Sequence, residues 1–275
     1  MLKNFSIFLF LLILFSKSYA QNNSLSIKYI GVENGLSNNI VNSLYQDGFG
    51  FVWMGTYDGL NRYDGYNFKV FRNNWGEENS LINNHITALN GAGNRVWIGT
   101  QKGVSYYDYS DSKFHNLKYK NNNERRDFQF SVNAIAVDKN LNVFIATDEH
   151  GLLVLRNGQT VAENIPLKKD KLYAIKALFV DESQNLWFYA KDYGFCRYNS
   201  SLKNITIIDA KIRNLTSITE GKGGILWLGS EHGLYQFNKV DKQLTVVKNY
   251  PASDNIMNLM LDKDDKLWVS TDGNG

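Results

Sequence analysis

The 275-residue chain has little of what cross-links small exported proteins or binds nucleic acid. It contains one cysteine and two prolines, so Cys196 cannot form a disulfide within the chain, and we expect it to be a small buried hydrophobic residue. The formal net charge is only +3, which is not the balance of a nucleic-acid-binding protein. Beyond residue 20 no stretch approaches roughly 18 consecutive apolar residues, so we expect no membrane span there.

The first 20 residues have the features of a secretory signal peptide. Lys3 gives a positive start, Ile7–Phe15 is an unbroken apolar run, and Ser18–Ala20 (SYA) is a small-x-small cleavage motif. We therefore predict cleavage before Gln21 and export to the periplasm. Removal of Lys3 and Lys17 lowers the net charge from +3 to about +1.

One phrase recurs along the chain at a nearly constant interval. An aromatic residue at its centre, which we call the aromatic anchor, occupies six positions: Trp53, Trp97, Phe144, Trp187, Trp227 and Trp268. The spacings are 44, 47, 43, 40 and 41 residues, and a fixed period of this length indicates a repeat architecture. A residue type that occurs once per repeat is first a packing residue, so we interpret the anchors as structural.

Each repeat carries signals for four strands. A short apolar run ending in aspartate precedes the anchor in four repeats: Ile40–Asp47, Val132–Asp138, Ile175–Asp181 and Ile256–Asp262. We expect the aspartate to open a turn by accepting backbone N–H groups. After the anchor strand comes a glycine that permits a positive φ, then a third strand and a weaker fourth.

Four antiparallel strands per period of about 43 residues indicate a β-propeller blade. We therefore predict an all-β propeller with five complete four-stranded blades and half of a sixth, in which Gly55, Gly99 and Gly229 let the neighbouring blade approach closely. Residues 21–275 would form the N-terminal part of this domain. The segment Leu25–Ile30 is placed to supply the outer strand of the final blade.

The candidate binding surface lies at one end of the blades. In a four-stranded blade, the turn between the second and third strands lies at the same end as the crossover to the next blade, and loops on a rigid scaffold carry function. The candidate ligand-binding residues there are Tyr57, Asp58, Trp75, Lys102, His150, Tyr193 and His232. Trp75 lies outside the repeat pattern and is of the type that stacks on a sugar ring. The alternative is that these loops are solvated turns or contact a second propeller.

No catalytic or cofactor motif is recognisable, and we expect no cofactor. The H-E-x-x-H and G-x-S-x-G patterns are absent. His150 and His232 each follow a glutamate at equivalent places, an arrangement that suits either a metal site near the axis or two exposed turns. Asp262–Asp265 (DKDD) lacks the glycine and distal glutamate of a calcium loop, so we interpret it as a turn, and Asn123–Asp127 (NERRD) as a solvated loop.

The first repeat resembles a known family. Its phrases GLSNN, QDGFGFVWMGT and DGLNRYDG, within Gly35–Phe68, resemble the opening of the two-component regulator propeller, which is the periplasmic sensor region of Bacteroidetes hybrid two-component histidine kinases. The resemblance covers roughly residues 25–275 and loosens after the first repeat, where Phe144 replaces tryptophan and Phe188–Ala190 departs from W-x-G-T.

The resemblance implies a ligand-sensing module from a seven-bladed propeller that detects an oligosaccharide or a polysaccharide breakdown product. Kinase and output domains are absent from this sequence, so the chain itself would not be an enzyme. Its partners would be the remaining propeller blades or a kinase polypeptide. The alternative is a secreted propeller enzyme, such as a metal-assisted polysaccharide or antibiotic lyase, because such enzymes share the repeat rhythm and often use a His–Glu pair with a metal.

Overall fold

The computed structural model describes residues 28–121, 124–168, 171–248, 250 and 255–273. The chain divides into two compact units, Met1–Ile30 and Gly31–Gly275, and every described strand lies in the second. The predicted signal peptide and residues 25–27 lie outside the described residues, and Lys28–Ile30 form no strand. No described helix is long and apolar enough to cross a membrane.

The described residues are all-β and form six sheets in chain order. The first contains β1 (Val41–Gln46), β2 (Val52–Thr56), β3 (Gly59–Tyr63) and β4 (Phe68–Phe71), and the second contains β5 (Ile86–Ala92), β6 (Arg95–Thr100), β7 (Gly103–Asp108) and β8 (Lys113–Asn116). The third contains β11 (Val132–Val137), β12 (Val143–Thr147), β13 (Leu152–Leu155) and β14 (Val161–Ile165), extended by β9 (Lys118–Asn121) and β10 (Glu124–Asp127). The fourth contains β15 (Ile175–Val180), β16 (Asn185–Ala190), β17 (Gly194–Asn199) and β18 (Asn204–Asp209).

The fifth sheet contains β19 (Leu215–Glu220), β20 (Ile225–Ser230), β21 (Gly233–Asn238) and β22 (Gln243–Val246), and the sixth contains β23 (Ile256–Leu261) and β24 (Leu267–Thr271). Two short 3-10 turns, η1 (Val32–Asn34) and η2 (Lys222–Gly224), complete the described elements. The prediction of five four-stranded blades and half of a sixth is confirmed.

The predicted loop at Asn123–Asp127 is wrong in its described part. Glu124–Asp127 form β10, which pairs antiparallel with β9, and β9 pairs parallel with β14. All four side chains of β10 are exposed, so the segment shows no apolar alternation that would predict a strand. The hairpin is held instead through β9, where buried Tyr119 packs edge-on against Phe128 and Phe130.

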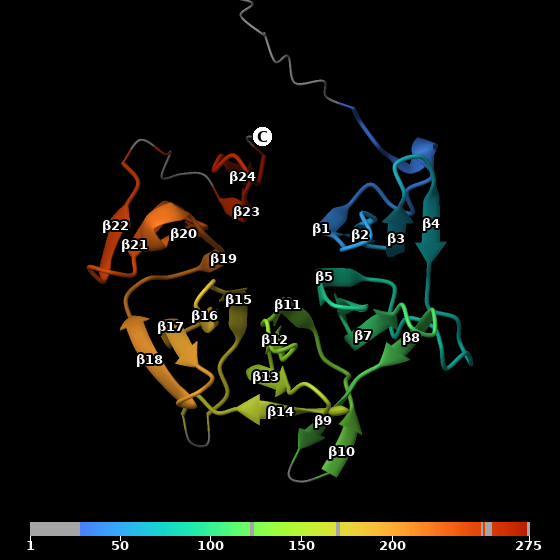
Figure 1. Ribbon diagram of the computed structural model, residues 1–275, viewed down its shortest axis with the longest axis horizontal. Helices are drawn as coiled ribbons and strands as arrows, with labels where there is room; N and C mark the ends of the chain where they lie inside the picture. The colour runs from blue at the N-terminus through green and yellow to red at the C-terminus, as the bar shows by residue number, and fades with distance from the viewer. Residues whose placement is uncertain (1–27, 122–123, 169–170, 249, 251–254, 274–275) are drawn as a thin grey trace, which may run out of the picture. The chain divides into compact units, whose positions relative to one another are not determined.

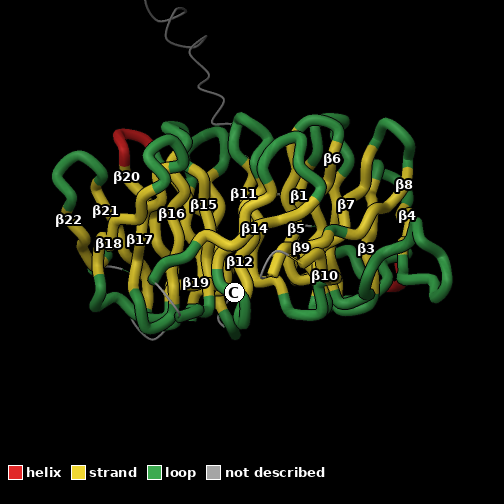
Figure 2. The backbone as a smooth tube through the Cα atoms, turned by 90° about the horizontal axis from the view of Figure 1, so that it is seen from below, coloured by secondary structure: helices red, strands yellow, loops and turns green. Residues whose placement is uncertain are grey.

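The sheets follow one another around an axis, as the view in Figure 1 shows, and are the blades of the propeller. The first strand of each blade is the innermost, and each contacts the next in the order β1, β5, β11, β15, β19, β23. Figure 2 shows the strands from the side, with loops gathered at their two ends. One end, here the crossover end, carries the crossovers between blades and the turns between second and third strands; there Tyr57 N donates to Ile40 O at 3.1 Å and Gln101 N to His85 O at 3.1 Å.

The opposite end is organised by the predicted aspartate turns. Asp47 Oδ1 accepts the backbone N–H groups two and four residues on, at 2.9 and 3.0 Å. Its Oδ2 accepts the indole N–H of Trp53 at 2.6 Å. The same pairing joins Asp181 to Trp187 at 2.8 Å and Asp262 to Trp268 at 2.8 Å. The aspartate therefore fixes the turn and the anchor together, and the turn predicted at Asp262 is confirmed.

The third repeat keeps this geometry although its anchor has no N–H. Asn142 Nδ2 donates to Asp138 Oδ2 at 2.8 Å, replacing the indole donor. At the crossover end, Thr56 Oγ1 donates to Gly59 O at 2.9 Å, and Gly59 has a φ of +116°. This explains the T-x-x-G rhythm of the repeat, because the hydroxyl closes a turn that only glycine adopts without strain.

Close packing between blades explains the glycine two residues after the anchor. A Cβ on Gly55 would lie 2.5 Å from Cγ2 of Ile86, the first residue of the next inner strand. Gly99 and Gly229 meet the first residue of the following inner strand in the same way, at 2.7 and 2.6 Å. The expectation that these glycines admit the neighbouring blade is confirmed.

The aromatic anchors are not equally buried. Trp53, Trp97, Phe144 and Trp187 are at most 3% exposed, Trp227 is partly buried, and Trp268 is 46% exposed. Trp268 departs from the expectation of a buried anchor because β24 is the second of only two described strands in its sheet. Cys196 is fully buried, and burial raises the pKa of its thiol to about 12, so the thiol stays protonated and unreactive at neutral pH.

Candidate ligand-binding site

The inner strands share a β-bulge near the crossover end. In every first-to-second strand pair, the register shifts between the first and third residues of the inner strand. The extra residue is the second of the strand: Asn42, Thr87, Asn133, Lys176, Thr216 and Met257. A bulge bends the strand and redirects a side chain, and here it does so at the same level of all six blades. We call these six residues the axial ring.

Three members of the axial ring connect one blade to the next. Asn42 Nδ2 donates to Ile86 O at 2.8 Å, and Asn133 Nδ2 donates to Ile175 O at 2.8 Å. Thr216 Oγ1 donates to the corresponding carbonyl of the sixth blade at 2.6 Å. Each acceptor is the first residue of the next inner strand, so the bulge residue satisfies a carbonyl and fixes the spacing between blades.

The axial ring also holds a charged cluster. Lys176 Nζ lies 2.5 Å from Asp148 Oδ1, and Asn133 Nδ2 donates to the same oxygen at 2.8 Å. Burial alone would raise the pKa of Asp148, but the hydrogen bonds from Lys176 and Asn133 and the charges of Lys176 and Lys191 outweigh it and lower that pKa. The Lys176 side chain is 40% exposed, so a paired charge remains accessible to a ligand.

A cavity of about 250 Å³ lies between the inner strands and is lined by residues of the axial ring from all six blades. Three buried hydroxyl oxygens among its lining residues, those of Ser43, Thr87 and Ser217, have no hydrogen-bond partner in the described part of the chain. Buried polar atoms are normally paired. Unpaired hydroxyls, carboxamides and an ion pair around one cavity form a set that can bind a hydroxyl-rich ligand.

The residues predicted from the second-to-third strand turns lie elsewhere around this end. The Tyr57 ring packs at a tilt against His85 at 4.1 Å between ring centroids, and Asp58 pairs with Arg72 at 3.1 Å. Lys102 is exposed. None of the seven predicted residues lines the axial cavity, so the structure does not bring them together there.

Tyr193 lies in a small aromatic group of its own. Its ring packs against Tyr173 at 4.7 Å, its hydroxyl donates to Leu167 O at 3.1 Å, and burial raises its pKa. Lys171 Nζ lies 4.6 Å from the centroid of Tyr173. The Tyr193 side chain is therefore partly engaged in contacts within the protein. Trp75, in contrast, is 99% exposed on the crossover between β4 and β5.

The two equivalent histidines differ in environment. His150 stacks on Phe130 at 3.8 Å, and its Nε2 lies 3.3 Å from the Tyr119 hydroxyl. Burial lowers the pKa of His150 despite the charge of Glu149. His232 is exposed. Within the described residues, no three histidine, cysteine, aspartate or glutamate side chains lie together as a metal-binding group.

The axial ring was missed at the level of sequence, although a signal for it exists. Asn42, Thr87, Asn133, Lys176 and Thr216 are polar residues in the second position of their strands. One such residue would pass as a tolerated exception. Their recurrence at the same position of successive repeats is the pattern that would have identified the ring.

The comparisons with known proteins fit this architecture. A family model described as the two component regulator propeller matches residues 35–58. Histidine kinase P4 of Formosa agariphila is 40% identical over 77 residues, which are 28% of this chain and 6% of that protein. The chain thus corresponds to a small part of that curated relative.

Two solved structures extend the comparison to the fold. The extracellular domain of a putative hybrid two-component system from B. thetaiotaomicron has a TM-score of 0.75 at 23% identity, over 90% of this chain and 34% of that one. A streptogramin B lyase has a TM-score of 0.65 at 13% identity, over 83% of this chain and 75% of that one. Both similarities concern the propeller fold.

Proposed function

We propose that this chain, which carries a two-component regulator propeller repeat, is part of the extracytoplasmic sensor region of a hybrid two-component signalling system. The observation that carries the proposal is the fit of nearly the whole chain to the extracellular domain of such a system. The match of the first repeat to the regulator propeller model supports the same assignment. Export through residues 1–20 would place the module in the periplasm.

The proposed ligand is a short oligosaccharide bound at the crossover end, over the axial ring. Sugars present closely spaced hydroxyl groups that both donate and accept hydrogen bonds. The ring offers matching partners in the carboxamide oxygens of Asn42 and Asn133, whose nitrogens already donate within the chain, in the hydroxyl of Thr87 and in the Lys176–Asp148 pair. Trp75, fully exposed at the same end, supplies an aromatic face that can stack on a sugar ring.

Calorimetric titration with short neutral and acidic oligosaccharides tests this proposal. Lys176→Met should weaken binding by about tenfold or more, because a hydrogen bond to a charged group is lost. Lys139→Met is the matched control: Lys139 is an exposed lysine in the turn after β11, at the opposite end. Equal weakening by both variants, or no oligosaccharide binding at all, would contradict the proposed site.

The chain is proposed to bind its ligand without chemical conversion. A lyase of the same fold is the competing function, and it would need His150 or His232 to hold a metal. His150 instead packs against Phe130 and Tyr119. Elemental analysis of the purified protein decides between the two: stoichiometric metal that disappears in the His150→Ala, His232→Ala double variant would favour the lyase.

The proposed partners are further blades of the same receptor. Apolar side chains of β1 and of the sixth blade are exposed, including Leu44 at 64%, Met260 at 57% and Trp268 at 46%. Exposed apolar faces and strand edges promote association. Residues 21–275 expressed alone are therefore expected to self-associate in light scattering. A monodisperse monomer that unfolds cooperatively would contradict this partner proposal.

A further inference from the structure

The second blade lacks the aspartate that organises the turns of the first, third, fourth and sixth blades; the fifth blade also lacks it and carries Gly221 at that position. Its first two strands are joined by the two residues Gly93 and Asn94, and Ala92 pairs with Arg95 at the end of the ladder. In the first blade, Gln46 pairs with Val52, and the next residue, Asp47, begins the turn. The turn of the second blade is one residue shorter, and Ala92 stands where the aspartate would be.

This replacement leaves the anchor of the second blade without its acceptor. The indole N–H groups of Trp53, Trp187 and Trp268 each donate to an aspartate Oδ2. No described residue accepts the N–H of Trp97, although the Trp97 side chain is only 3% exposed. The Trp97 nitrogen is not among the fully buried polar atoms that lack a partner in the described residues, and Trp97 lines a cavity, so its N–H is available to an acceptor from outside the chain.

The neighbouring blade does not fill the space. Between the first and second blades, the Tyr109 hydroxyl donates to Asp47 and covers the turn. Between the fourth and fifth, Lys239 Nζ reaches Asp181 Oδ2 at 3.2 Å. Between the second and third, Ala92 and Trp97 line a cavity of about 470 Å³.

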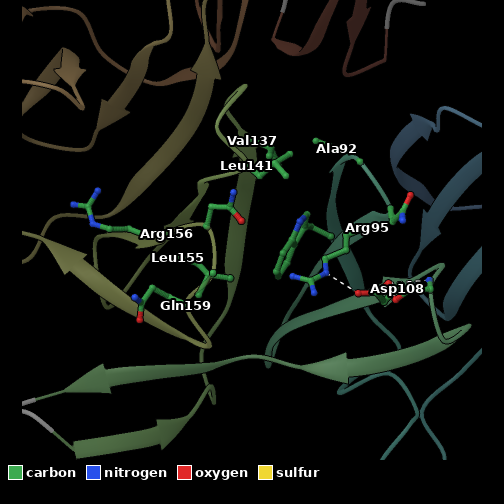
Figure 3. Close-up of a pocket in the computed structure, with 14 residues that line it drawn as sticks. Ala92, Arg95, Asp108, Val137, Leu141, Leu155, Arg156 and Gln159 are labelled. Atoms are coloured by element: carbon green, nitrogen blue, oxygen red, sulfur yellow. Dashed lines mark hydrogen bonds and ion pairs between the residues drawn. The ribbon is translucent and has the colours of Figure 1, made fainter.

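Figure 3 shows the walls of this cavity. Ala92 and Arg95 of the second blade lie on one side, and Leu141, Leu155 and Gln159 of the third blade lie on the other. Arg95 Nε donates to Asp108 Oδ2 at 2.7 Å, the dashed line in the figure. No described residue accepts from its two terminal nitrogens, so they remain available to a second carboxylate.

We propose that this cavity binds the carboxylate of a small organic acid. The carboxylate would take the place of the missing aspartate, with one oxygen accepting the Trp97 N–H and Arg95 donating to the other. The carbon body would lie against Ala92, Leu141 and Leu155. Cavities of this size accommodate small molecules, and a planar anion matches the fork of the guanidinium. The proposal concerns the aspartate-turn end and does not depend on the ligand of the axial ring.

Titration of the ¹⁵N-labelled full chain with glucuronate, followed through the indole N–H resonances, tests the proposal. Glucuronate should shift the Trp97 resonance selectively, and glucose, which lacks the carboxylate, should not. Trp97→Phe keeps the ring, as Phe144 does in the third blade, but removes the donor. This variant and Arg95→Gln should each weaken binding in calorimetry by about tenfold.

Ala92→Asp is the most specific variant, because it restores the carboxylate that the first, third, fourth and sixth blades carry at this position. It should abolish glucuronate binding, whereas Lys69→Gln, at an exposed lysine of β4, should leave it unchanged. An unshifted Trp97 resonance, undiminished binding by Ala92→Asp, or an equal response to sulfate would each overturn the assignment to a carboxylate.

Discussion

Between the first and second blades, the Asp47 carboxylate accepts hydrogen bonds from Trp53 of its own blade and Tyr109 of the next. Between the second and third, the same positions are occupied by Ala92 and Asn157, and both line a cavity. The two interfaces are built from the same repeat and differ at these two positions, one in each of the facing blades. The comparison shows that the aspartate fills the space between blades as well as shaping the turn, so its loss converts a structural contact into a potential binding site.

The largest expected effect concerns a filled interface. Trp187 is 2% exposed and packs against Phe195 and Phe237, each at 5.5 Å. Trp187→Ala should lower the free energy of unfolding by about 3–5 kcal/mol, because a large buried side chain leaves a cavity. Trp268→Ala is the control, since that side chain is 46% exposed, and it should cost under about 1 kcal/mol. Similar losses in denaturant unfolding would refute the assigned difference in burial.

The next largest loss of stability is expected from the Asp181 carboxylate, which connects the fourth and fifth blades. Asp181 is 1% exposed and accepts hydrogen bonds from Trp187 and Lys239. Asp181→Ala should cost about 3 kcal/mol, because it leaves the buried indole donor of Trp187 unpaired and removes one of the two carboxylates that pair with Lys239, the other being Glu220. Ala92→Ser changes the side chain at the equivalent turn, beside the cavity between the second and third blades. It should lower the free energy of unfolding by under about 1 kcal/mol. Urea unfolding of both variants measures this difference in the free energy of unfolding. A small loss of stability in Asp181→Ala would contradict the proposed role of the aspartate.

The parts of the fold that could be predicted from the sequence are those whose sequence pattern recurs in successive repeats. The strands and the aspartate turns follow from apolar runs and turn residues that recur, so they were predicted from the sequence. The hairpin of β9 and β10 was not, because Glu124–Asp127 has only exposed side chains and is held by pairing with a distant strand.

The sites were harder to predict than the fold. Lys176 joins Asp148 only after two blades stack, and no spacing within one repeat indicates that contact. The cavity forms where the turn before Arg95 is one residue shorter than in the first blade. This shortening barely changes the spacing between the aromatic anchors, so only the strand register reveals it. Trp75 was recognised because it breaks the repeat, and the structure places it in solvent.

A smaller effect on stability is expected when acid protonates Asp108, which lines the cavity between the second and third blades. Burial would raise the pKa of Asp108, but hydrogen bonds from Ser110 and Arg95 outweigh it and lower the pKa from 3.8 to about 2. Because the folded-state pKa is depressed, the unfolded chain binds more protons in this range, and the contribution of Asp108 is present above pH 3.8 and lost as the pH falls towards 2. The stability difference between the protein and Asp108→Asn should therefore shrink by up to about 2 kcal/mol across that window. A constant difference in pH-dependent urea unfolding would argue against the depressed pKa.

The smallest effect is predicted for the hydroxyl that covers the first turn. Tyr109→Phe removes the donor to Asp47 but keeps the ring against Tyr107, at 5.0 Å between centroids. Loss of one such hydrogen bond should cost about 1 kcal/mol. Tyr106→Phe in the same blade is the control, since that ring faces Trp97 rather than an aspartate, and it should cost less. A larger loss from the control would show that the ring, and not the hydroxyl, seals the interface.

Hydrogen exchange of the indole N–H groups tests the central claim most directly, because it reads the acceptor of each anchor separately. Trp53 and Trp187 donate to buried aspartates, so their indole protons should exchange slowly, at a rate set by larger opening motions. Trp97 is as well buried but has no acceptor among the described residues and faces the cavity. Its proton should exchange much faster in the ligand-free protein. Equal protection of Trp97, Trp53 and Trp187 would contradict the account, since it would mean that the second and third blades are sealed like the others.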